Sequence, residues 1–477
     1  MWRVVRLLPV VIALAGCAQG ESSADDLRQA WLTDALVDDN LVWLSRDHAL
    51  LQAKYAAMAA DPYDYMRGTA GVFLRDQARP GTARAPTAFL TAPETTAVLI
   101  VGDPHPENVG TLRPGEGPGP TDAAPVLLLE VNDLDGASFG PYTIDVRRAL
   151  LGLQTLLVAA SCSADCRGSV SGAWVEAYVD ELAAISTGAP TWRPGVILGQ
   201  HGAALDLLLS DAITEGTSRE RRGETTEVTP DGRRFRLDAA LDPLGNGILG
   251  LTPAERAQAD RLLDAVPGPP GFRVLDVARR YGSGIASMPA IRYVVAWDRG
   301  DPGPDDDELL QLREVVDPPA MPGIHAPAPA WFDTGGDRVV HASHLLWSRP
   351  EADVRLAAVP DGAATFKVLT WSSFHAPHRH DVLVREIDNG GLTLDDLRTW
   401  ADVLGRQLAA VHGRSVTASG APALGVLMDD LSGRQDAFVA ERVRDAEADV
   451  DALLRDHALF NAALQDHGPL LGAERLR

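Results

Sequence analysis

The sequence predicts an α+β fold of two lobes, on three observations. The chain has 477 residues, which is long for a single hydrophobic core, and 45% of its residues are hydrophobic. Helical periodicity marks both ends of the chain, whereas apolar runs of strand length alternate with turn signals in between. The run PGPPG at 267–271 would interrupt any continuous element, so it is the best candidate boundary. The predicted units are a helical lobe at 25–266, a β-rich region at 272–390 and C-terminal helices at 391–477 that pack on the helical lobe.

The N-terminus is expected to be a secretory signal. Two arginines precede an apolar run that is too short to span a membrane as a mature helix. The run ends in LAGC, which resembles a bacterial lipobox, where the signal is cut before a cysteine that then carries lipid. An ordinary signal peptide cut nearby is the alternative. We expect a signal at 1–16, a flexible polar tether at 17–24 and a lipid anchor at Cys17. The protein would then be exported and held on the periplasmic face of the cell envelope.

The composition argues against nucleic acid as a partner. The formal net charge is −23 and the pI is near 4.9, so most of the surface would repel a phosphate backbone. A local basic pocket remains compatible with this balance.

Two cysteines remain after the one at the lipobox. Cys162 and Cys166 lie in SCSADC, and the predicted compartment permits oxidation. A local disulfide is one alternative. Two free thiols on a loop are the other, because the geometry of a bridge at this spacing is demanding.

Helices are predicted in three parts of the chain. Apolar residues recur at helical spacings from Asp25 to about Ala60, and DPYDYMRG closes this segment. Residues 145–188 are predicted as helices interrupted at SCSADC. Near the C-terminus, Thr393 can cap a helix with Asp396 three positions on. Its apolar stripe consists of Leu397, Ala401, Leu404, Leu408 and Val411.

Strands are predicted from short apolar runs. Ala97–Val101 and Val126–Val131 have the composition of buried strands, and each ends on an acidic cluster. The stretch TEVTPDGRRFRL has a Pro-Asp-Gly turn between alternating flanks, which predicts a hairpin. Beyond the boundary, the runs predicted to form a small sheet lie at 273–297, 309–316, 366–374 (FKVLTWSSF) and 381–387 (DVLVREI).

The two acidic turns carry the predicted chemistry. VGDPHPENVG places Asp103, His105 and Asn108 in one turn after a strand, where a rigidly held carboxylate could accept a proton from a hydroxyl nucleophile. The amide oxygen of Asn108 could ligate a hard cation, with Asp133 as the charged ligand and Asp135 assisting. Mg²⁺ prefers few carboxylates plus phosphate oxygens, so a nucleotide would bring the remaining ligands. The expected reaction is phosphoryl transfer.

A structural interpretation of these turns is also open. Asp, Pro and Asn are ordinary turn formers, so DPHPEN alone could be a connection between two strands. The second motif, NDLD, favours function. Two strand-terminal acidic clusters match how protein-kinase-like folds arrange the base, the amide ligand and the metal-binding aspartate.

VGDPHPENVG resembles the Gly-Asp-x-His-x-x-Asn catalytic loop of aminoglycoside phosphotransferases and related small-molecule kinases. VNDLDG stands where their metal-binding aspartate stands, and Asp145 resembles the structural aspartate that follows. The chain also resembles the bacterial family called domain of unknown function 2252, from about residue 60 to 415. The stretches that carry this resemblance are DPYDYMRGTAGVF, VGDPHPENVG, VNDLDGASFGPYTIDVRRAL, DVARRYGSGIASMPAIRYVV, LLQLREV, DVLVREI and LAAVHGRS.

The order of the motifs implies a circular permutation. In an ordinary kinase the Gly-rich strand pair and its lysine precede the catalytic loop, but here YGSGIASMPAIRYVV and LLQLREV follow it. The resemblance therefore implies a protein-kinase-like, two-lobed fold, permuted in sequence. Gly282 and Gly284 would let backbone N–H groups approach phosphates, and a plain glycine turn is the alternative. Arg313 stands where family members usually carry lysine. Arginine keeps the charge but not the lysine's point-charge position, which bears on turnover more than on binding.

Other polar residues have weaker signals. Arg67 in YMRG belongs to a family stretch and would contact phosphate or an aspartate, or be a surface charge at a helix end. His105 would orient its own turn or contact substrate. In FHAPHRHD, His375, His378 and His380 suggest a metal site, with exposed loop histidines as the alternative.

The leading hypothesis is a kinase-like phosphotransferase that uses Mg²⁺ and ATP or another nucleotide. Its acceptor would be a small molecule or another hydroxyl substrate that the sequence does not specify. A catalytically inactive, kinase-shaped binding lipoprotein is the alternative, because ATP is scarce outside the cytoplasm. A metal-handling lipoprotein built on the histidine-rich loop is a third hypothesis.

Overall fold

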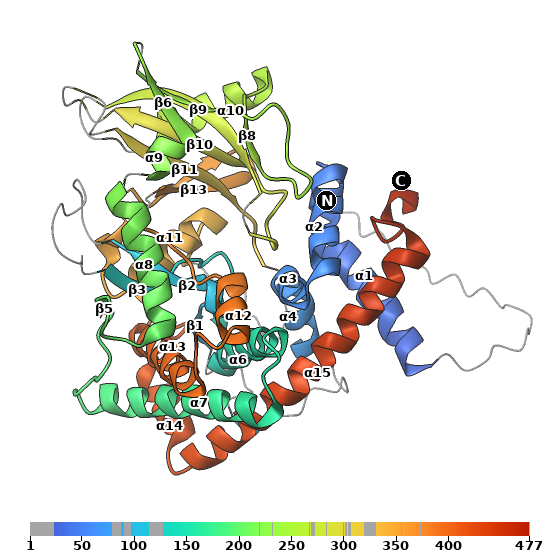
Figure 1. Cartoon of the computed structure of the whole chain (residues 1–477), viewed down its shortest axis with the longest axis vertical. Helices are drawn as coiled ribbons and strands as arrows, with labels where there is room; N and C mark the ends of the chain where they lie inside the picture. Colours follow the sequence, from blue (N-terminus) through green and yellow to red (C-terminus); the bar gives the residue numbers. More distant parts are fainter. Residues whose placement is uncertain are drawn as a thin grey trace, which may run out of the picture.

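The computed structural model contains one unit built on an antiparallel sheet and one mainly helical unit (Figure 1). It describes residues 23–78, 87–89, 97–113, 127–218, 220–230, 232–266, 268, 272–282, 284–298, 300, 303, 307–318, 331–353, 355–371 and 374–476. The predicted signal at 1–16 and the predicted lipid-bearing Cys17 lie outside the described residues. The described residues combine long helices with antiparallel sheets, so the fold is of the α+β class. Among the described helices, none has the length and apolar character needed to cross a membrane.

Four helices begin the described part of the chain, where the sequence predicts one helical segment. They are α1 (Ala24–Leu44), α2 (His48–Ala60), α3 (Pro62–Gly68) and α4 (Ala70–Ala78). The first break lies at Asp47, whose side chain accepts a hydrogen bond from the backbone N–H of Leu50 and caps α2. DPYDYMRG does not close the helical segment, because Asp61 caps α3 and Pro62 suits its first turn.

Short strands carry the two acidic turns. They are β1 (Val98–Ile100), β2 (Val109–Leu112), β3 (Leu127–Val131), β4 (Ser138–Gly140) and β5 (Gly195–Val196), with the 3-10 turn η1 (Pro106–Asn108) before β2. β1 pairs with β4, and a second small sheet has the order β2-β3-β5. The two apolar runs predicted as strands, 97–101 and 126–131, contain β1 and β3, and Val126 lies outside the described residues. Strands β1 to β4 are buried along their length, as continuous apolar runs require.

Further helices complete the helical unit. They are α6 (Tyr142–Ala159), α7 (Ala164–Ser186), α8 (Ala203–Ser218), α9 (Glu220–Thr225), α12 (His380–Asp388), α13 (Leu394–Arg414), α14 (Leu424–Leu431), α15 (Gln435–His467) and η3 (Ala473–Leu476). The predicted interruption at SCSADC is confirmed, since it separates α6 from α7. Cys162 and Cys166 form a disulfide there, with Cα atoms 5.7 Å apart. The predicted cap is also confirmed, because Thr393 and Asp396 form a capping box at the start of α13.

The other unit is a six-stranded sheet with the order β12-β13-β11-β10-β9-β8, antiparallel throughout. Its strands are β8 (Gly247–Leu249), β9 (Arg273–Tyr281), β10 (Arg292–Asp298), β11 (Glu308–Val315), β12 (Ala357–Asp361) and β13 (Ala364–Thr370). The predicted hairpin is confirmed as β6 (Thr226–Thr229) paired with β7 (Gly232–Phe235). Helices α10 (Pro253–Ala265) and α11 (Gly335–Leu346) and the 3-10 turn η2 (Pro350–Ala352) belong to the same part of the chain. In Figure 1 the sheet lies at one end of the molecule, and strands β2 and β3 lie between it and α7.

Two predictions about this unit differ from the structure. DVLVREI is not a strand but most of α12, because its apolar residues Leu383, Val384 and Ile387 follow a helical spacing and contact the helical core. PGPPG does not separate the two units, since β8 and α10 precede it and yet join the sheet. Leu262 of α10 lies in the same apolar cluster as Val295 of β10.

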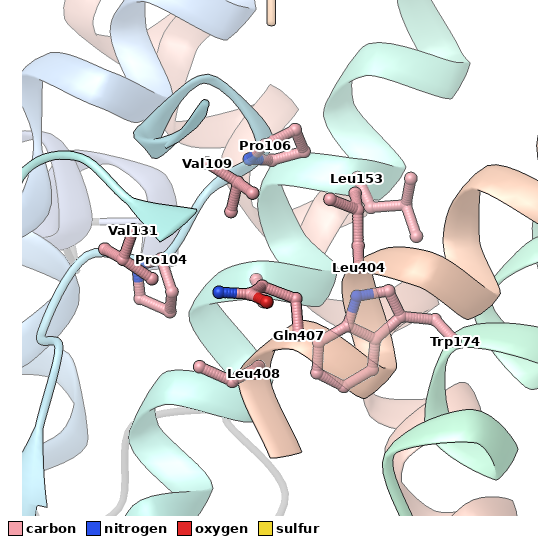
Figure 2. Close-up of a pocket in the computed structure, with 10 residues that line it drawn as sticks. Pro104, Pro106, Val109, Val131, Leu153, Trp174, Leu404, Gln407 and Leu408 are labelled. Atoms are coloured by element: carbon pink, nitrogen blue, oxygen red, sulfur yellow. The ribbon is translucent and has the colours of Figure 1, made fainter. Parts of the chain in front are cut away.

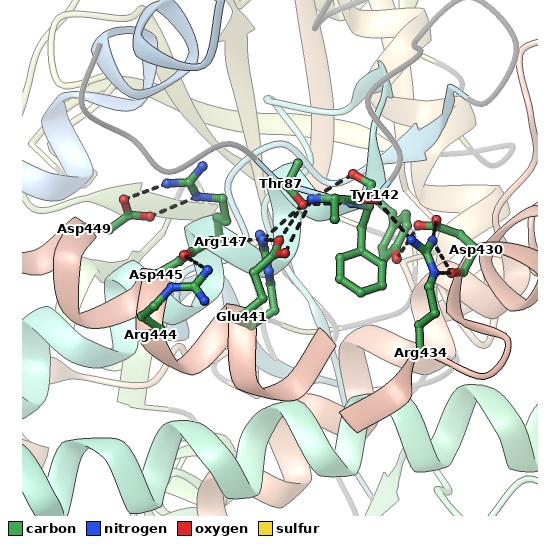
Figure 3. A network of polar contacts seen from close by, with 12 residues as sticks. Thr87, Tyr142, Arg147, Asp430, Arg434, Glu441, Arg444, Asp445 and Asp449 are labelled. Atoms are coloured by element: carbon green, nitrogen blue, oxygen red, sulfur yellow. Dashed lines mark hydrogen bonds and ion pairs between the residues drawn. The ribbon is translucent and has the colours of Figure 1, made fainter. Parts of the chain in front are cut away.

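Two side chains in the first turns of helix α6 bind the C-terminal helices α14 and α15 (Figure 3). The hydroxyl of Tyr142 donates to Asp430, with an oxygen-to-oxygen distance of 2.9 Å. Arg147 makes two hydrogen bonds to Asp449 of α15, at 3.0 and 2.7 Å, and both side chains are buried. Removing one partner of such a buried pair costs about 3–5 kcal/mol. These contacts fix the helix that supplies Asp145 and Arg148 to the candidate site.

Candidate functional site

The two acidic turns predicted from the sequence lie against each other. Gly102 has a φ of +86°, and a Cβ there would meet the carbonyl oxygen of Gly136 at 2.1 Å. Only glycine permits both this backbone conformation and this close approach. The backbone N–H of Asn132 also donates to the carbonyl of Asn108, at 3.0 Å. The loop that carries Asp103 is therefore held beside the loop 132–136.

The side of the first turn that faces the helical core is apolar. Pro104 and Pro106 point into the core, toward Leu153, Trp174 and Leu404 of the surrounding helices (Figure 2). The cavity between them has a volume of about 10 Å³, which is room for one water molecule at most. The prolines thus anchor the turn, and the cavity beneath it is not a ligand site.

Asp145 fixes the backbone of this turn from α6. Its fully buried carboxylate accepts hydrogen bonds from the N–H groups of Val101, at 2.7 Å, and Gly102, at 2.8 Å. Nε2 of His412 lies 3.0 Å from the same carboxylate, and Nδ1 of His412 lies 2.7 Å from the hydroxyl of Tyr178. A buried carboxylate with several partners is a rigid support, so the position of Asp103 depends on Asp145.

Asp103 is oriented by charged and polar neighbours. The Nε of buried Arg148 donates to its carboxylate at 2.7 Å, and Nε2 of His105 lies 3.8 Å from its other oxygen. The amide nitrogen of Asn108 donates to the backbone carbonyl of Asp103 at 2.8 Å, so its amide oxygen is the atom that remains for a ligand. Burial lowers the pKa of His105 to about 4, so this ring is neutral at pH 7.

The second turn meets the sheet at a cluster of four charges. Arg313 of β11 lies 2.9 Å from Asp133 and 2.8 Å from Asp135, measured from its Nη2 atom to carboxylate oxygens. The Nζ atom of Lys367 in β13 lies 2.6 Å from Asp135 and 3.4 Å from Asp133. Burial alone would raise the pKa of Asp133, but the charges of Arg313 and Lys367 hold it well below its usual range.

The cations of this cluster come from neighbouring strands. Arg313 is the register partner of Lys367 on one side and of Arg292 in β10 on the other, so the three side chains share one face of the sheet. Arg292 and Arg313 both donate to the hydroxyl of Ser287, at 2.8 and 3.1 Å. We refer to Arg292, Arg313 and Lys367 as the cation row.

The predicted glycine loop lies beside the cation row. The carbonyl of Gly282 accepts a hydrogen bond from Arg292 at 2.9 Å, and Gly284 has a φ of +83°. A Cβ at Gly282 would meet the side-chain oxygen of Asn246 at 1.8 Å. Close packing against Asn246 therefore accounts for the presence of glycine at position 282. Ser283 lies outside the described residues.

Arg67 is not an isolated surface charge at a helix end. Its Nη1 atom lies 2.9 Å from Glu107, in the first acidic turn, and 3.1 Å from Asp64. Glu107 also accepts hydrogen bonds from the ring of His380, at 2.7 Å, and from its backbone N–H, at 2.9 Å. Burial would raise the pKa of Glu107, but His380 and Arg67 lower it to about 2. Burial would lower the pKa of His380, but Asp61 and Glu107 raise it to about 10.

The histidine-rich loop does not form a metal site in the described residues, which contain no group of three His, Cys, Asp or Glu side chains placed to hold a metal. The alternative of exposed loop histidines is also wrong for His378, which is buried. Its Nδ1 lies 2.8 Å from the carbonyl of Val109, and its Nε2 accepts a hydrogen bond from Trp400 at 3.0 Å. His380 is the ion-pair partner of Glu107, and His375 is half-buried.

Sequence reasoning missed Lys367, although a signal for it exists. Only two lysines, Lys54 and Lys367, occur among the 43 Lys and Arg residues of the chain. The side chains of both are buried, with residue exposures of 3% and 4%. A chain that uses arginine at nearly every cationic position keeps lysine where a compact point charge is needed. Arg148 and Arg292 were also missed, and an isolated arginine in this arginine-rich sequence gives no comparable signal.

The comparisons with known proteins identify a family. A family model described as "Uncharacterized protein conserved in bacteria (DUF2252)" matches residues 46–463, which include every site residue discussed above. No curated protein and no solved structure matches the chain. The match covers most of the sequence. The chain therefore belongs to the DUF2252 family of bacterial proteins.

Proposed function

We propose that this protein is a kinase-like phosphotransferase, which moves a phosphoryl group from a Mg²⁺-bound nucleotide such as ATP to a hydroxyl of a small molecule. The observation that carries the proposal is the meeting of Asp133 and Asp135 with Arg313 and Lys367, beside the turn that holds Asp103 and Asn108. Phosphoryl transfer depends mainly on positioning and electrostatic stabilisation, and this arrangement offers groups for both.

The cation row supports the phosphate side of the proposal. It places three basic side chains on one face of the sheet, two of which contact Asp133 and Asp135, in a chain whose formal net charge is −23. Such a local excess of positive charge favours an anionic ligand. The Nε atom of Arg313 is buried and has no hydrogen-bond partner among the described residues, so a donor is available to a phosphate oxygen.

Lys367 supplies a lysine beside Arg313, where the resemblance leads one to expect lysine and this chain has arginine. By the resemblance described above, family members usually carry lysine where this chain has Arg313, and an arginine fork cannot replace a lysine's point charge without rearrangement. Lys367 lies directly across the strand pair from Arg313 and supplies that point charge from β13. The proposal therefore assigns the phosphate contacts to both residues, and the substitution at 313 does not exclude turnover.

The donor set near Asp133 suits Mg²⁺. Mg²⁺ binds through one or two carboxylates together with phosphate oxygens, and Asn108 and Asp133 offer an amide oxygen and a carboxylate. Bound there, Mg²⁺ would neutralise charge on the transferring phosphoryl group. In the structure, Arg313 and Lys367 pair with Asp133, the carboxylate that this role requires. Binding of a nucleotide would turn Arg313 and Lys367 toward phosphate and free Asp133.

Asp103 is the proposed base. Its carboxylate would accept the proton of the acceptor hydroxyl as that oxygen forms its bond to phosphorus and the bond to the nucleotide's leaving oxygen breaks. Arg148, at 2.7 Å, holds the carboxylate in a fixed orientation. The sheet unit would cover the nucleotide, and because it follows the catalytic turn in sequence, the kinase-like fold would be circularly permuted.

A binding protein without turnover is the second candidate. The feature that favours it is the N-terminal segment ending in LAGC, which resembles a lipoprotein signal. We propose export and anchoring at Cys17 on this resemblance. A phosphoryl donor would then have to reach the protein outside the cytoplasm, where ATP is scarce.

The test is to measure ADP formation from ATP with Mg²⁺ and a mixture of small hydroxyl compounds. We expect wild-type protein to form ADP, and Asp103→Asn to lower the rate by about 10²–10⁴-fold, which is the usual contribution of a general base. The dissociation constant for Mg²⁺-ATP, measured by calorimetry, should stay within a few fold. Binding without ADP formation would favour the second candidate, and absence of both binding and ADP formation would reject the phosphotransferase.

A further inference from the structure

We infer that Arg46, in the turn between α1 and α2, and Lys54 of α2 are positioning residues that hold Ser287 and Arg313 in place beside Asp133. We call this pair of contacts the latch. The inference rests on the proposed function only for the identity of the ligand. The positioning itself is argued from contacts within the protein.

The first contact of the latch fixes β11 next to Arg313. Arg46 follows the end of α1, and both of its Nη atoms bind the carboxylate of Glu314, with the longer bond at 3.0 Å. A bidentate pair of this kind fixes direction as well as distance. Glu314 also accepts a hydrogen bond from the backbone N–H of Ile291 at 2.9 Å, so one carboxylate of β11 connects the turn after α1 with the residue that precedes β10.

The second contact fixes the turn that carries Ser287. The Nζ atom of Lys54 donates to the carbonyl of Ala286 at 2.9 Å and to the side-chain oxygen of Asn40 at 2.7 Å. Burial lowers the pKa of Lys54 to about 8, against the opposing charge of Asp39. Placing a lysine in so buried a position is costly unless its hydrogen bonds are made, and Ala286 supplies one of them.

Each of the two contacts is made by a residue that directly adjoins a residue of the candidate site in the chain. Glu314 adjoins Arg313, and Ala286 adjoins Ser287, whose hydroxyl accepts hydrogen bonds from Arg292 and Arg313. Arg313 in turn contacts Asp133. Arg46 and Lys54 thus each contact a segment that holds Arg313 beside the carboxylates. Arg46 contacts β11, and Lys54 contacts the turn that carries Ser287. In Figure 1, α2 lies beside the sheet unit, where these contacts are made.

Loss of the latch should loosen one local group of hydrogen bonds. In the turn 285–290, the N–H of Met288 donates to the carbonyl of Ile285, and that of Ala290 to Ser287. Just after this turn, the carbonyl of Ile291 accepts a hydrogen bond from the backbone N–H of Glu314. Lys54→Met keeps the apolar stem but removes every donor. Arg46→Ala is the milder change, because the arginine side chain is 34% exposed.

Hydrogen exchange measured by mass spectrometry on ligand-free protein tests the latch. We expect peptides covering 284–292 and 310–315 to exchange at least tenfold faster in Lys54→Met and in Arg46→Ala than in wild-type protein. The matched control is Arg455→Ala, which removes a cation that pairs with Asp25 at the other end of α1, where both side chains are at least half exposed. The control should leave both peptides unchanged.

A ligand measurement on the same variants separates the latch from the proposed function. If wild-type protein binds Mg²⁺-ATP, the dissociation constant should rise about tenfold in both latch variants and stay unchanged in the control. If wild-type protein binds no nucleotide, the proposed function fails, and the exchange result alone decides the latch. Unchanged exchange at 284–292 in both latch variants overturns it. A uniform rise over the whole chain also overturns it, because that result reflects general destabilisation.

Discussion

Asp133→Ala is expected to abolish the stabilisation of the protein by Mg²⁺-ATP in a thermal unfolding experiment. A ligand present at a hundredfold excess over its dissociation constant raises the free energy of unfolding by about 2.7 kcal/mol. The variant should lose all of this, because Asp133 is the proposed carboxylate ligand of Mg²⁺. The fold should persist, since Asp135 remains to pair with Arg313 and Lys367 at 2.8 and 2.6 Å.

The matched control for this variant is Asp361→Ala. Asp361 lies in the same sheet unit, at the end of β12, and pairs with Arg261 at 3.0 Å, but it is not part of the candidate site. The control should keep the full stabilisation by Mg²⁺-ATP. Equal stabilisation of wild-type protein and Asp133→Ala would remove residue 133 from the site and count heavily against the proposal.

His380→Gln is expected to destabilise the protein strongly near pH 6 and much less near pH 10. The pKa of His380 is raised to about 10, so its stabilising contribution is fully present below its ordinary pKa and is lost as the pH rises through 10. The pKa of Glu107 is lowered to about 2, so its contribution is lost as the pH falls below its ordinary range. The pair therefore stabilises most between about pH 4.5 and 6.5. Removing one partner of such a pair should cost about 3 kcal/mol at pH 6.

Denaturant unfolding of both proteins at pH 6 and pH 10 measures this difference. The matched control is His341→Gln, because His341 also lies near an aspartate, Asp337, at 3.0 Å, but its side chain is 52% exposed. Exposed pairs contribute about 0–1 kcal/mol, so the control should change little at either pH. A cost for His380→Gln that is the same at both pH values would show that its charge does not hold Glu107.

The first acidic turn illustrates what a sequence can predict about this site. Apolar runs that end on Asp103 and Asp133 predict two buried strands with polar ends, and the strands are found where expected. The adjacency of the two turns depends on Gly102 as well, because its φ of +86° and its close approach to the carbonyl of Gly136 require glycine at this position. Short-range rules of this kind operate within a few residues of the motif, so they can be applied without a structure.

Lys367 illustrates what the sequence leaves out. Its role follows from the register of β13 against β11, and register is set by the whole sheet rather than by the residues around position 367. The error at 381–387 has a related origin. A seven-residue run of mixed apolar and charged residues fits a strand or a helix, and the contact of its apolar residues with the helical core, together with the hydrogen bond from the N–H of His380 to Glu107, favours the helix.

The most direct test of the central claim is acylation of the protein by an acyl phosphate of ATP. A lysine amine near the bound phosphates attacks the acyl carbon, forms an amide and releases ATP. Lys54 and Lys367 are the only lysines in the sequence, so mass spectrometry can assign an acylated lysine without ambiguity. We predict acylation at Lys367, none at Lys54, and suppression by excess Mg²⁺-ATP. An unmodified Lys367, or modification that excess Mg²⁺-ATP does not suppress, would contradict the claim that the cation row binds nucleotide phosphates.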